Sequence, residues 1–215
     1  MTWCVPPFDQ AIELLLAHVR AEYAPRGIVV SGSIVRGEAG PTSDLDVLVV
    51  HDAAWRLRDQ RRFAGVPAEL FVNPPAQTRR YFASEHEAGR PSTAHMFATG
   101  EPIAPVDPVV AALIDEARDW LARPLEISPA RLEARRYAPV DLLDDARDVA
   151  AGDPATARLL LGEAVRLIVE YAFWRARRFQ PRRKRALAAL EDLARHVLGV
   201  DAFFAWSSGR EPVAL

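Results

Sequence analysis

The segment between residues 27 and 50 constrains the fold most, because two β-type runs there flank a short polar segment with several glycines. The first run, residues 27–31, ends at Gly32-Ser33, where glycine allows the chain to turn tightly. The second run, residues 44–50, has an acidic start and a fully apolar finish, and it is the clearest strand in the sequence. These features predict a β-sheet built around this segment.

Helices and strands are expected on both sides of this segment. Apolar residues recur at helical spacing in residues 8–23, so we expect an amphipathic helix there. Residues 53–63 are polar and are predicted as a helix or an excursion, whereas residues 66–72 form an apolar strand with Glu69 in its middle. Two further helices are predicted, a surface helix over residues 77–87 and a shorter one over 92–99.

Prolines at positions 102, 105 and 108 mark the expected boundary between two domains. Beyond it, four helices are predicted and suggest a small bundle: they cover residues 109–121, 129–150, 154–179 and 184–200. The third of them is apolar on most sides and is expected at the centre of the bundle. The predicted fold class is therefore α+β, with a mixed-sheet domain over residues 1–105 and an all-helical domain over residues 106–215.

Composition restricts the class of protein. Half of the 215 residues are apolar and the formal net charge is -2, so the chain can bury a core and does not have the basic character of a general nucleic-acid binder. The single cysteine excludes an internal disulfide. We see no signal peptide and no apolar run near membrane-spanning length, so we expect a cytoplasmic protein without membrane contact.

Three carboxylates are candidates for a metal site. Asp44 and Asp46 are two residues apart at the start of a strand, so both project from one face. Oxygen ligands in this arrangement suit Mg²⁺, although a solvated strand end would show the same pattern. Glu69 lies in an apolar strand, where an unpaired charge would be costly. It would join the other two if the strands are neighbours, and pairing with an arginine is the alternative.

The glycine-rich turn is a candidate phosphate site. Backbone N–H groups around Gly32, Ser33 and Gly37 could bind phosphate oxygens, and the serine adds a hydroxyl donor. Residues 32–37 and 43–47 read Gly-Ser-Ile-Val-Arg-Gly and Ser-Asp-Leu-Asp-Val. Together they resemble the signature of the DNA polymerase β-like nucleotidyltransferases. The helical half is similar in layout to the aminoglycoside and lincosamide nucleotidyltransferases.

This resemblance implies a function and a set of roles. Asp44, Asp46 and Glu69 would be the metal ligands and catalytic carboxylates, with Glu69 either a ligand of the second metal or the general base. The implied cofactors are Mg²⁺ and ATP as the donor nucleotide. The residues expected to bind that donor are Gly32, Ser33, Arg36, Ser43 and Lys184. The expected reaction moves AMP onto a hydroxyl of a small molecule or protein and releases pyrophosphate.

Several alternatives remain open from the sequence. The basic run over residues 175–185 is either a solvated corner, a triphosphate contact through Lys184, or an RNA contact. An acidic helix face is either solvated or a docking face for a cationic acceptor; its members are Asp141, Asp144, Asp145 and Asp148. The chain could also be the nucleotidyltransferase half of a toxin–antitoxin pair or a non-catalytic nucleotide-binding module. We expect a monomer or homodimer and no nucleic-acid partner.

Overall fold

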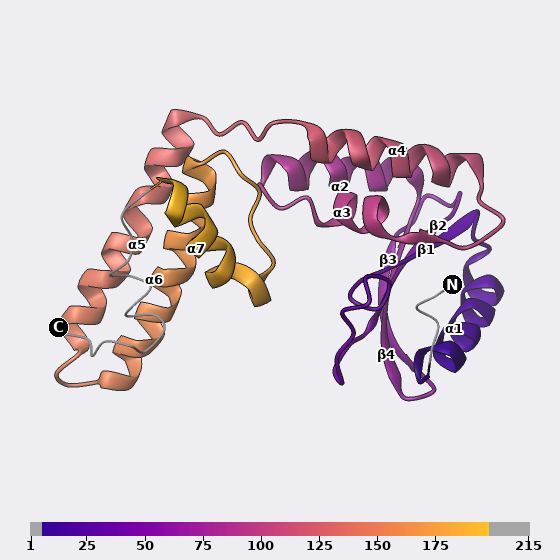
Figure 1. Cartoon of the computed structure of the whole chain (residues 1–215), viewed down its shortest axis with the longest axis horizontal. Coiled ribbons are helices and arrows are strands. Elements are labelled where there is room, and N and C mark those ends of the chain that lie inside the picture. The colour runs from indigo at the N-terminus through magenta and orange to yellow at the C-terminus, as the bar shows by residue number, and fades with distance from the viewer. Residues whose placement is uncertain (1–5, 198–215) are drawn as a thin grey trace. The chain divides into compact units, whose positions relative to one another are not determined.

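The computed structural model describes residues 6–197, and the chain forms two compact units, Met1–Arg123 and Pro124–Leu215. The first unit contains a β-sheet and four helices among its described residues (Figure 1). In chain order its elements are α1 (Phe8–Tyr23), β1 (Gly27–Ser31), β2 (Leu45–Val50), β3 (Leu57–Phe63), β4 (Val66–Asn73), α2 (Pro75–Glu87), α3 (Ser92–Thr99), β5 (Glu101–Pro102) and α4 (Pro108–Ala122).

The sheet is mixed, as predicted, with the strand order β3-β4-β2-β1-β5. Strand β2 pairs parallel to β4, whereas the pairs β1–β2, β3–β4 and β1–β5 are antiparallel. The chain leaves β2, passes the position of β4 to form the edge strand β3, and returns through β4. This path makes β2 and β4 direct neighbours although β3 separates them in sequence.

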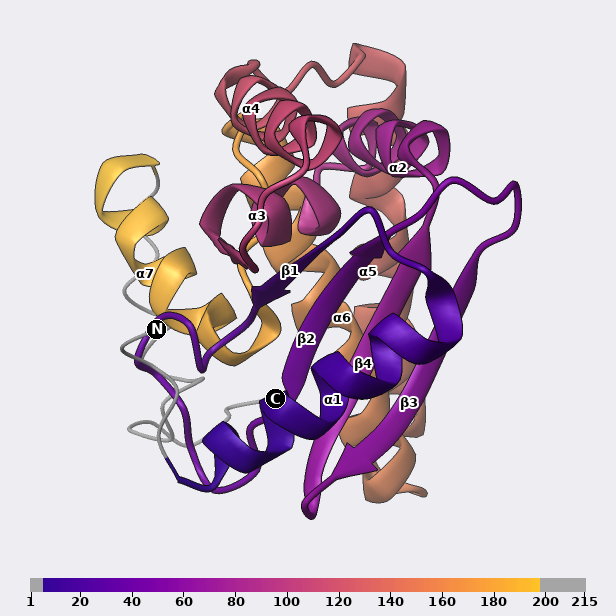
Figure 2. The same ribbon diagram turned by 90° about the vertical axis from the view of Figure 1, so that its right-hand side faces the viewer.

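Helices cover both faces of the sheet (Figure 2). Helix α1 packs on one face, where its Leu15 belongs to the same buried cluster as Val47 and Leu70. On the other face, Phe82 of α2 and Phe97 of α3 pack with buried residues of β1 and β2. Coverage of both faces explains why β2 ends in a continuous apolar run.

The polar segment before Gly65 is a strand, so the prediction of a helix or excursion over residues 53–63 is wrong where β3 forms. Most of its side chains are exposed, and it pairs with β4 along its full length. An edge strand buries little, so it lacks the apolar alternation that identifies a strand in sequence. Its register is set by pairing with β4, whose residues alternate between buried and half-buried.

Helix α4 packs with the sheet unit, whereas the sequence placed it in the helical domain over residues 106–215. Its Val110 and Leu113 join the cluster that contains Val29 of β1. The first compact unit therefore extends to Arg123 rather than to residue 105. Pro102 and Pro105 precede this helix and Pro108 is its first residue, so the prolines mark the start of a helix that packs on the sheet.

The second unit is helical, as predicted, and contains α5 (Pro129–Val149), α6 (Pro154–Arg175), a 3₁₀ turn η1 (Arg183–Arg185) and α7 (Ala186–Val197). Helices α5 and α6 form an antiparallel hairpin, and both begin with a side-chain cap, from Ser128 and from Asp153. Helix α6 contacts both α5 and α7, as expected of a central helix, but Leu159 is 74% exposed, so part of its apolar surface is not covered. Phe173 and Leu190 instead mark where α6 packs on α7.

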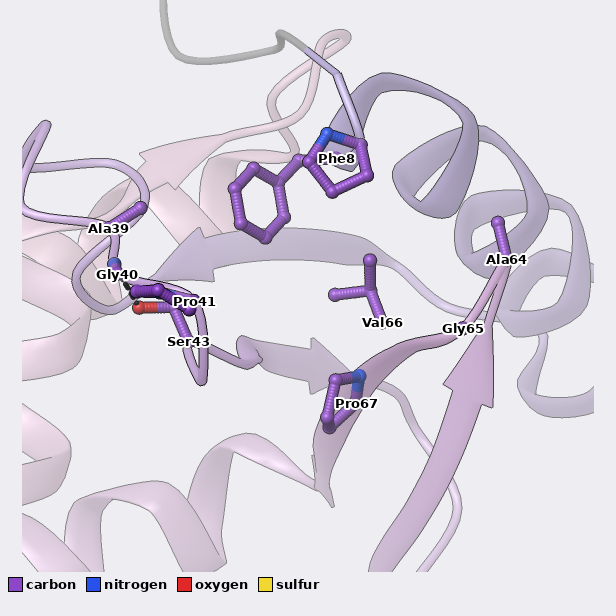
Figure 3. Close-up of a pocket in the computed structure, with 10 residues that line it drawn as sticks. Phe8, Ala39, Gly40, Pro41, Ser43, Ala64, Gly65, Val66 and Pro67 are labelled. Atoms are coloured by element: carbon purple, nitrogen blue, oxygen red, sulfur yellow. Dashed lines mark hydrogen bonds between the residues drawn. The ribbon is translucent and has the colours of Figure 1, made fainter.

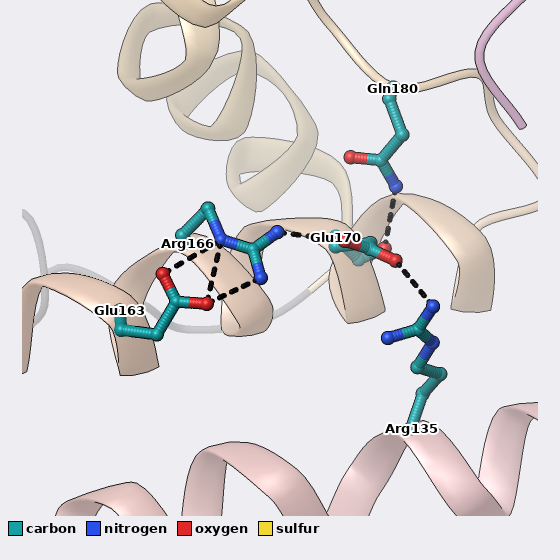
Figure 4. A network of polar contacts seen from close by, with 5 residues as sticks. All are labelled: Arg135, Glu163, Arg166, Glu170 and Gln180. Atoms are coloured by element: carbon teal, nitrogen blue, oxygen red, sulfur yellow. Dashed lines mark hydrogen bonds and ion pairs between the residues drawn. The ribbon is translucent and has the colours of Figure 1, made fainter. Parts of the chain in front are cut away.

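A polar network joins α6 to α5 (Figure 4). The guanidinium of Arg166 contacts both Glu163 and Glu170, at 2.6 and 3.2 Å. Glu170 is also paired with Arg135 of α5, at 3.4 Å. Because Glu163, Arg166 and Glu170 are three and four residues apart, they lie along one side of α6, and Glu170 links this side to α5. Within residues 6–197, no helix has the length and apolar character needed to cross a membrane.

Replacing Phe82 by Ala should test the packing of α2 on the sheet. Phe82 is fully buried and packs edge-on against Phe97, with ring centroids 5.7 Å apart. We expect Phe82→Ala to lower the free energy of unfolding by about 3–5 kcal/mol in urea titrations. Leu14→Ala, at a position 47% exposed on α1, is the control and should cost about 0.5 kcal/mol or less. Equal losses in the two variants would contradict this packing.

Candidate functional site

Three neighbouring strands place polar residues side by side at one end of the sheet. Ser31 of β1 is opposite Asp46 of β2, and Asp46 is in turn in register with Glu69 of β4. Adjacent strands are about 4.8 Å apart, so the two acids are near neighbours. Both are half-buried, and their strand neighbours Val47 and Leu70 point into the core beneath α1. The sequence left open whether the strands bearing these acids are neighbours, and the structure shows that β2 and β4 pair directly.

Asp44 lies just before β2 and is exposed, two residues from Asp46. Within the described part of the chain, no group of three or more His, Cys, Asp or Glu side chains is gathered closely enough to hold a metal ion. The structure therefore brings together the strand positions of Asp46 and Glu69 but not a closed cage of three carboxylates. The role of these acids as metal ligands stays a prediction.

Gly32 allows the turn after β1 to lie directly against Asp46. Its φ is +95°, a conformation that residues with a Cβ rarely adopt. A Cβ atom at this position would be 2.6 Å from Oδ2 of Asp46. Glycine is therefore required both for the backbone conformation and for the space that the carboxylate occupies.

The loop after Gly32 is held by its serines. The hydroxyl oxygens of Ser33 and Ser43 are 2.9 Å apart, and Ser43 also accepts a hydrogen bond from the N–H of Gly40 at 2.8 Å. Arg36, expected to bind the donor nucleotide, is paired with Glu38 at 3.0 Å. The predicted phosphate loop is thus a closed turn that brings Ser33 and Ser43 together, while Arg36 is paired with an acid.

Glu69 is bound by two side chains of the edge strand. Arg58 donates a hydrogen bond to its Oε1 and forms an ion pair with it, and Gln60 donates to the same oxygen at 3.2 Å. These donors stabilise the carboxylate, the arginine most strongly, and lower the pKa of Glu69 against the opposing effect of burial. The pairing with an arginine that the sequence left open is therefore present.

Arg58 and Gln60 were missed because β3 was not recognised as a strand. The signal in the sequence was Gly65, between the polar segment and the apolar run of residues 66–72. In the structure Ala64 and Gly65 form the two-residue connection, and both have positive φ, 45° and 81°. This is the conformation of a tight hairpin turn. A prediction of a hairpin at this point would have placed the polar residues of β3 opposite Glu69.

A pocket of about 520 Å³ lies beside the serine loop but does not contain the acids (Figure 3). Its walls come from the start of α1, the loop before β2 and the β3–β4 turn. Only Ser43 belongs both to this pocket and to the predicted donor site. The lining residues are Pro7, Phe8, Ala39, Gly40, Pro41, Ser43, Ala64, Gly65, Val66 and Pro67. Because the carboxylates do not line it, we do not assign it to the chemistry.

Lys184 lies exposed in η1 of the second unit. Its contact with the donor triphosphate remains a prediction. Among the histidines, His51 is 2% exposed and its ring lies tilted against that of Trp55, with centroids 4.2 Å apart. This burial lowers its pKa. A packing role explains His51 without a ligand.

Residues 12–82 match the family described as the nucleotidyltransferase domain. This range contains every candidate site residue except Lys184, so it supports the resemblance seen in residues 32–47. No curated protein is significantly similar to the chain. A nucleotidyltransferase-like protein from Exiguobacterium sibiricum has a solved structure with 12% identity and a TM-score of 0.45, covering 87% of this chain, while this chain spans 64% of that protein. The likeness of the helical half to aminoglycoside and lincosamide enzymes stays an interpretation.

Replacing Gly32 by Ala should destabilise the protein more than the same change at Gly37. Both glycines have positive φ, but a Cβ at Gly37 would meet nothing within 4 Å. We expect Gly37→Ala to cost about 1 kcal/mol from the backbone alone, and Gly32→Ala about 2 kcal/mol or more because Asp46 must also move. Urea unfolding measures both. Equal costs would show that the turn does not lie against Asp46.

Replacing Arg58 by Met should raise the pKa of Glu69 toward its ordinary value. The pKa of Glu69 is lower in the folded state than in the unfolded state, so the ion pair stabilises the fold at pH values above the unfolded-state pKa. This contribution to the free energy of unfolding is lost as the pH falls through the folded-state pKa. The difference in unfolding free energy from wild type, about 0.5–1 kcal/mol at neutral pH, should therefore vanish in acid.

Carboxyl NMR titration follows Glu69 directly. Arg61→Met is the control, because Arg61 pairs with Asp59 rather than with Glu69. An unchanged Glu69 titration in Arg58→Met, or an equal shift in Arg61→Met, would contradict the assigned pair.

Proposed function

We propose that the chain is a Mg²⁺-dependent nucleotidyltransferase that moves AMP from ATP onto a hydroxyl of an acceptor and releases pyrophosphate. The observation that carries this proposal is the register of Asp46 with Glu69, with the Gly32 turn packed on Asp46. The same residues fall within the segment that matches the nucleotidyltransferase domain. Carboxylates beside a glycine turn are the groups such a transfer requires, because it proceeds mainly by positioning and charge stabilisation.

The residues of this site fit a hard cation. Asp44 and Asp46 supply only oxygen donors, and the missing Cβ of Gly32 leaves the Asp46 carboxylate room beside the backbone. Mg²⁺ bound there would neutralise negative charge on the phosphates and lower the pKa of the attacking hydroxyl. Asp44 and Asp46 would hold it on the side of β2 that faces away from α1.

The serine loop is proposed to bind the phosphates. Ser33 and Ser43 present two hydroxyl groups 2.9 Å apart, and the neighbouring backbone N–H groups add further donors for phosphate oxygens. In the transfer, the acceptor oxygen forms a bond to the α-phosphorus while the bond from that phosphorus to the β-phosphate oxygen breaks. Pyrophosphate leaves, and the hydroxyl proton passes to a base or to water.

Glu69 fits the role of third metal ligand better than that of general base. An efficient base has a pKa near the working pH, whereas the contact with Arg58 lowers the pKa of Glu69. An ionised carboxylate next to Asp46 is suited to binding a cation. Metal binding by Glu69 would then have to displace or share its contact with Arg58.

Replacing Asp46 by Asn should abolish transfer and leave the fold intact. The amide keeps the shape of the side chain but loses the charge that binds the metal, so we expect at least about a hundredfold lower rate of pyrophosphate release. Circular dichroism and urea unfolding check the fold. Asp115→Asn, at an exposed helix position paired only with Arg118 among the described residues, is the control and should keep full activity. Full activity in Asp46→Asn would exclude the proposed metal site.

A further inference from the structure

Arg58 places a positive charge on the face of the sheet that carries the acids. It forms an ion pair with Glu69 from the neighbouring edge strand. Successive side chains of a strand alternate between the two faces. The next residue, Asp59, points toward α1, where it accepts a hydrogen bond from Tyr23. Arg58 therefore lies on the opposite face, together with Asp46 and Glu69.

The guanidinium of Arg58 acts on both acids. Its Nε donates a hydrogen bond to Oε1 of Glu69. The pKa of Arg58 is raised mainly by this hydrogen bond, and the negative charge of Asp46 adds to the effect. Asp46 is the register partner of Glu69 on β2. The guanidinium thus gives this pair of carboxylates the positive charge that a bound metal ion would otherwise supply.

Arg58 is held loosely enough to be displaced. Its side chain is 67% exposed, whereas that of Glu69 is 14% exposed. Within residues 6–197, Glu69 is its one hydrogen-bond and ion-pair partner. The guanidinium carbon also lies 5.2 Å from the ring centre of Phe71. Because an ion pair with an exposed partner contributes little to stability, the contact can be broken without unfolding the strand.

Glu69 would keep a neutral partner after Arg58 moves. Gln60 donates to its Oε1 at 3.2 Å, and an amide carries no charge that would repel a metal ion. A guanidinium and a divalent cation beside the same carboxylate do repel each other. The contact with Gln60 is therefore compatible with a bound metal, whereas the contact with Arg58 opposes one.

We propose that Arg58 is a built-in counter-ion of the Asp46–Glu69 pair, so that the nucleotide-free site holds a guanidinium in place of a divalent cation. This inference rests on the proposed nucleotidyl transfer. Substrate phosphates commonly complete the ligands of Mg²⁺. Oxygen ligands from the triphosphate would offset the lost contact between Arg58 and Glu69. The metal would then enter this position with the nucleotide rather than before it.

Binding of Mn²⁺ in the absence of nucleotide tests this inference. Carboxylate sites that suit Mg²⁺ also suit Mn²⁺, and electron paramagnetic resonance measures the free Mn²⁺. Mn²⁺ is titrated into wild type, Arg58→Gln, the double variant Arg58→Gln/Asp46→Asn and the control Arg62→Gln. Arg62 is an exposed arginine of the same strand whose guanidinium donates to the backbone oxygen of Gly65 rather than to Glu69. Urea unfolding confirms that each variant is folded.

We expect Arg58→Gln to bind Mn²⁺ about tenfold more tightly than wild type, because a repelling charge and a competing partner are both removed. Arg62→Gln should bind Mn²⁺ as wild type does, and the added Asp46→Asn change should remove the gain. The inference is overturned if Arg58→Gln binds Mn²⁺ no more tightly than wild type, if Arg62→Gln shows the same gain, or if the gain survives Asp46→Asn.

Binding of ATP with Mg²⁺ to wild type is measured separately. Absence of this binding counts against the proposed function, whereas the comparison of Mn²⁺ affinities without nucleotide decides the role of Arg58.

Discussion

The parallel pairing of β2 with β4 is the constraint on which the site depends. It fixes Asp46 beside Glu69, and a shift of one residue would turn one of the acids into the core beneath α1. Helices on both faces hold this register, because the apolar residues that alternate with the acids are buried. The same burial means that each carboxylate lowers the stability of the fold unless its charge has a partner.

The structure gives Asp46 space and neutralises Glu69 with an arginine. Gly32 gives the carboxylate of Asp46 room against the turn, and Arg58 neutralises Glu69 from the edge strand. A cation held by the carboxylates would compete with Arg58 for Glu69. The arrangement thus links metal binding to the position of the edge strand.

Much of the sheet unit was predictable from local sequence. The helix over residues 8–23, the strand from Leu45 to Val50 and the strand containing Glu69 follow from apolar periodicity. That Glu69 lies beside Asp46 depended on which strands pair, and only the structure shows this. The edge strand was not predictable in this way, because a strand with little burial has no apolar pattern. Consequently Arg58 and its effect on Glu69 were missed. The place of α4 on the sheet was also missed, since an amphipathic helix does not indicate which neighbour covers its apolar face.

Nucleotide binding measured by calorimetry tests the central claim most directly. ATP, GTP, CTP and UTP would each be titrated with and without Mg²⁺ into wild type and into the double variant Asp44→Asn/Asp46→Asn. The account predicts binding that requires Mg²⁺, prefers ATP and is lost in the double variant while the fold is retained. Binding of no nucleotide by wild type, or equal Mg²⁺-dependent binding by the double variant, would contradict it.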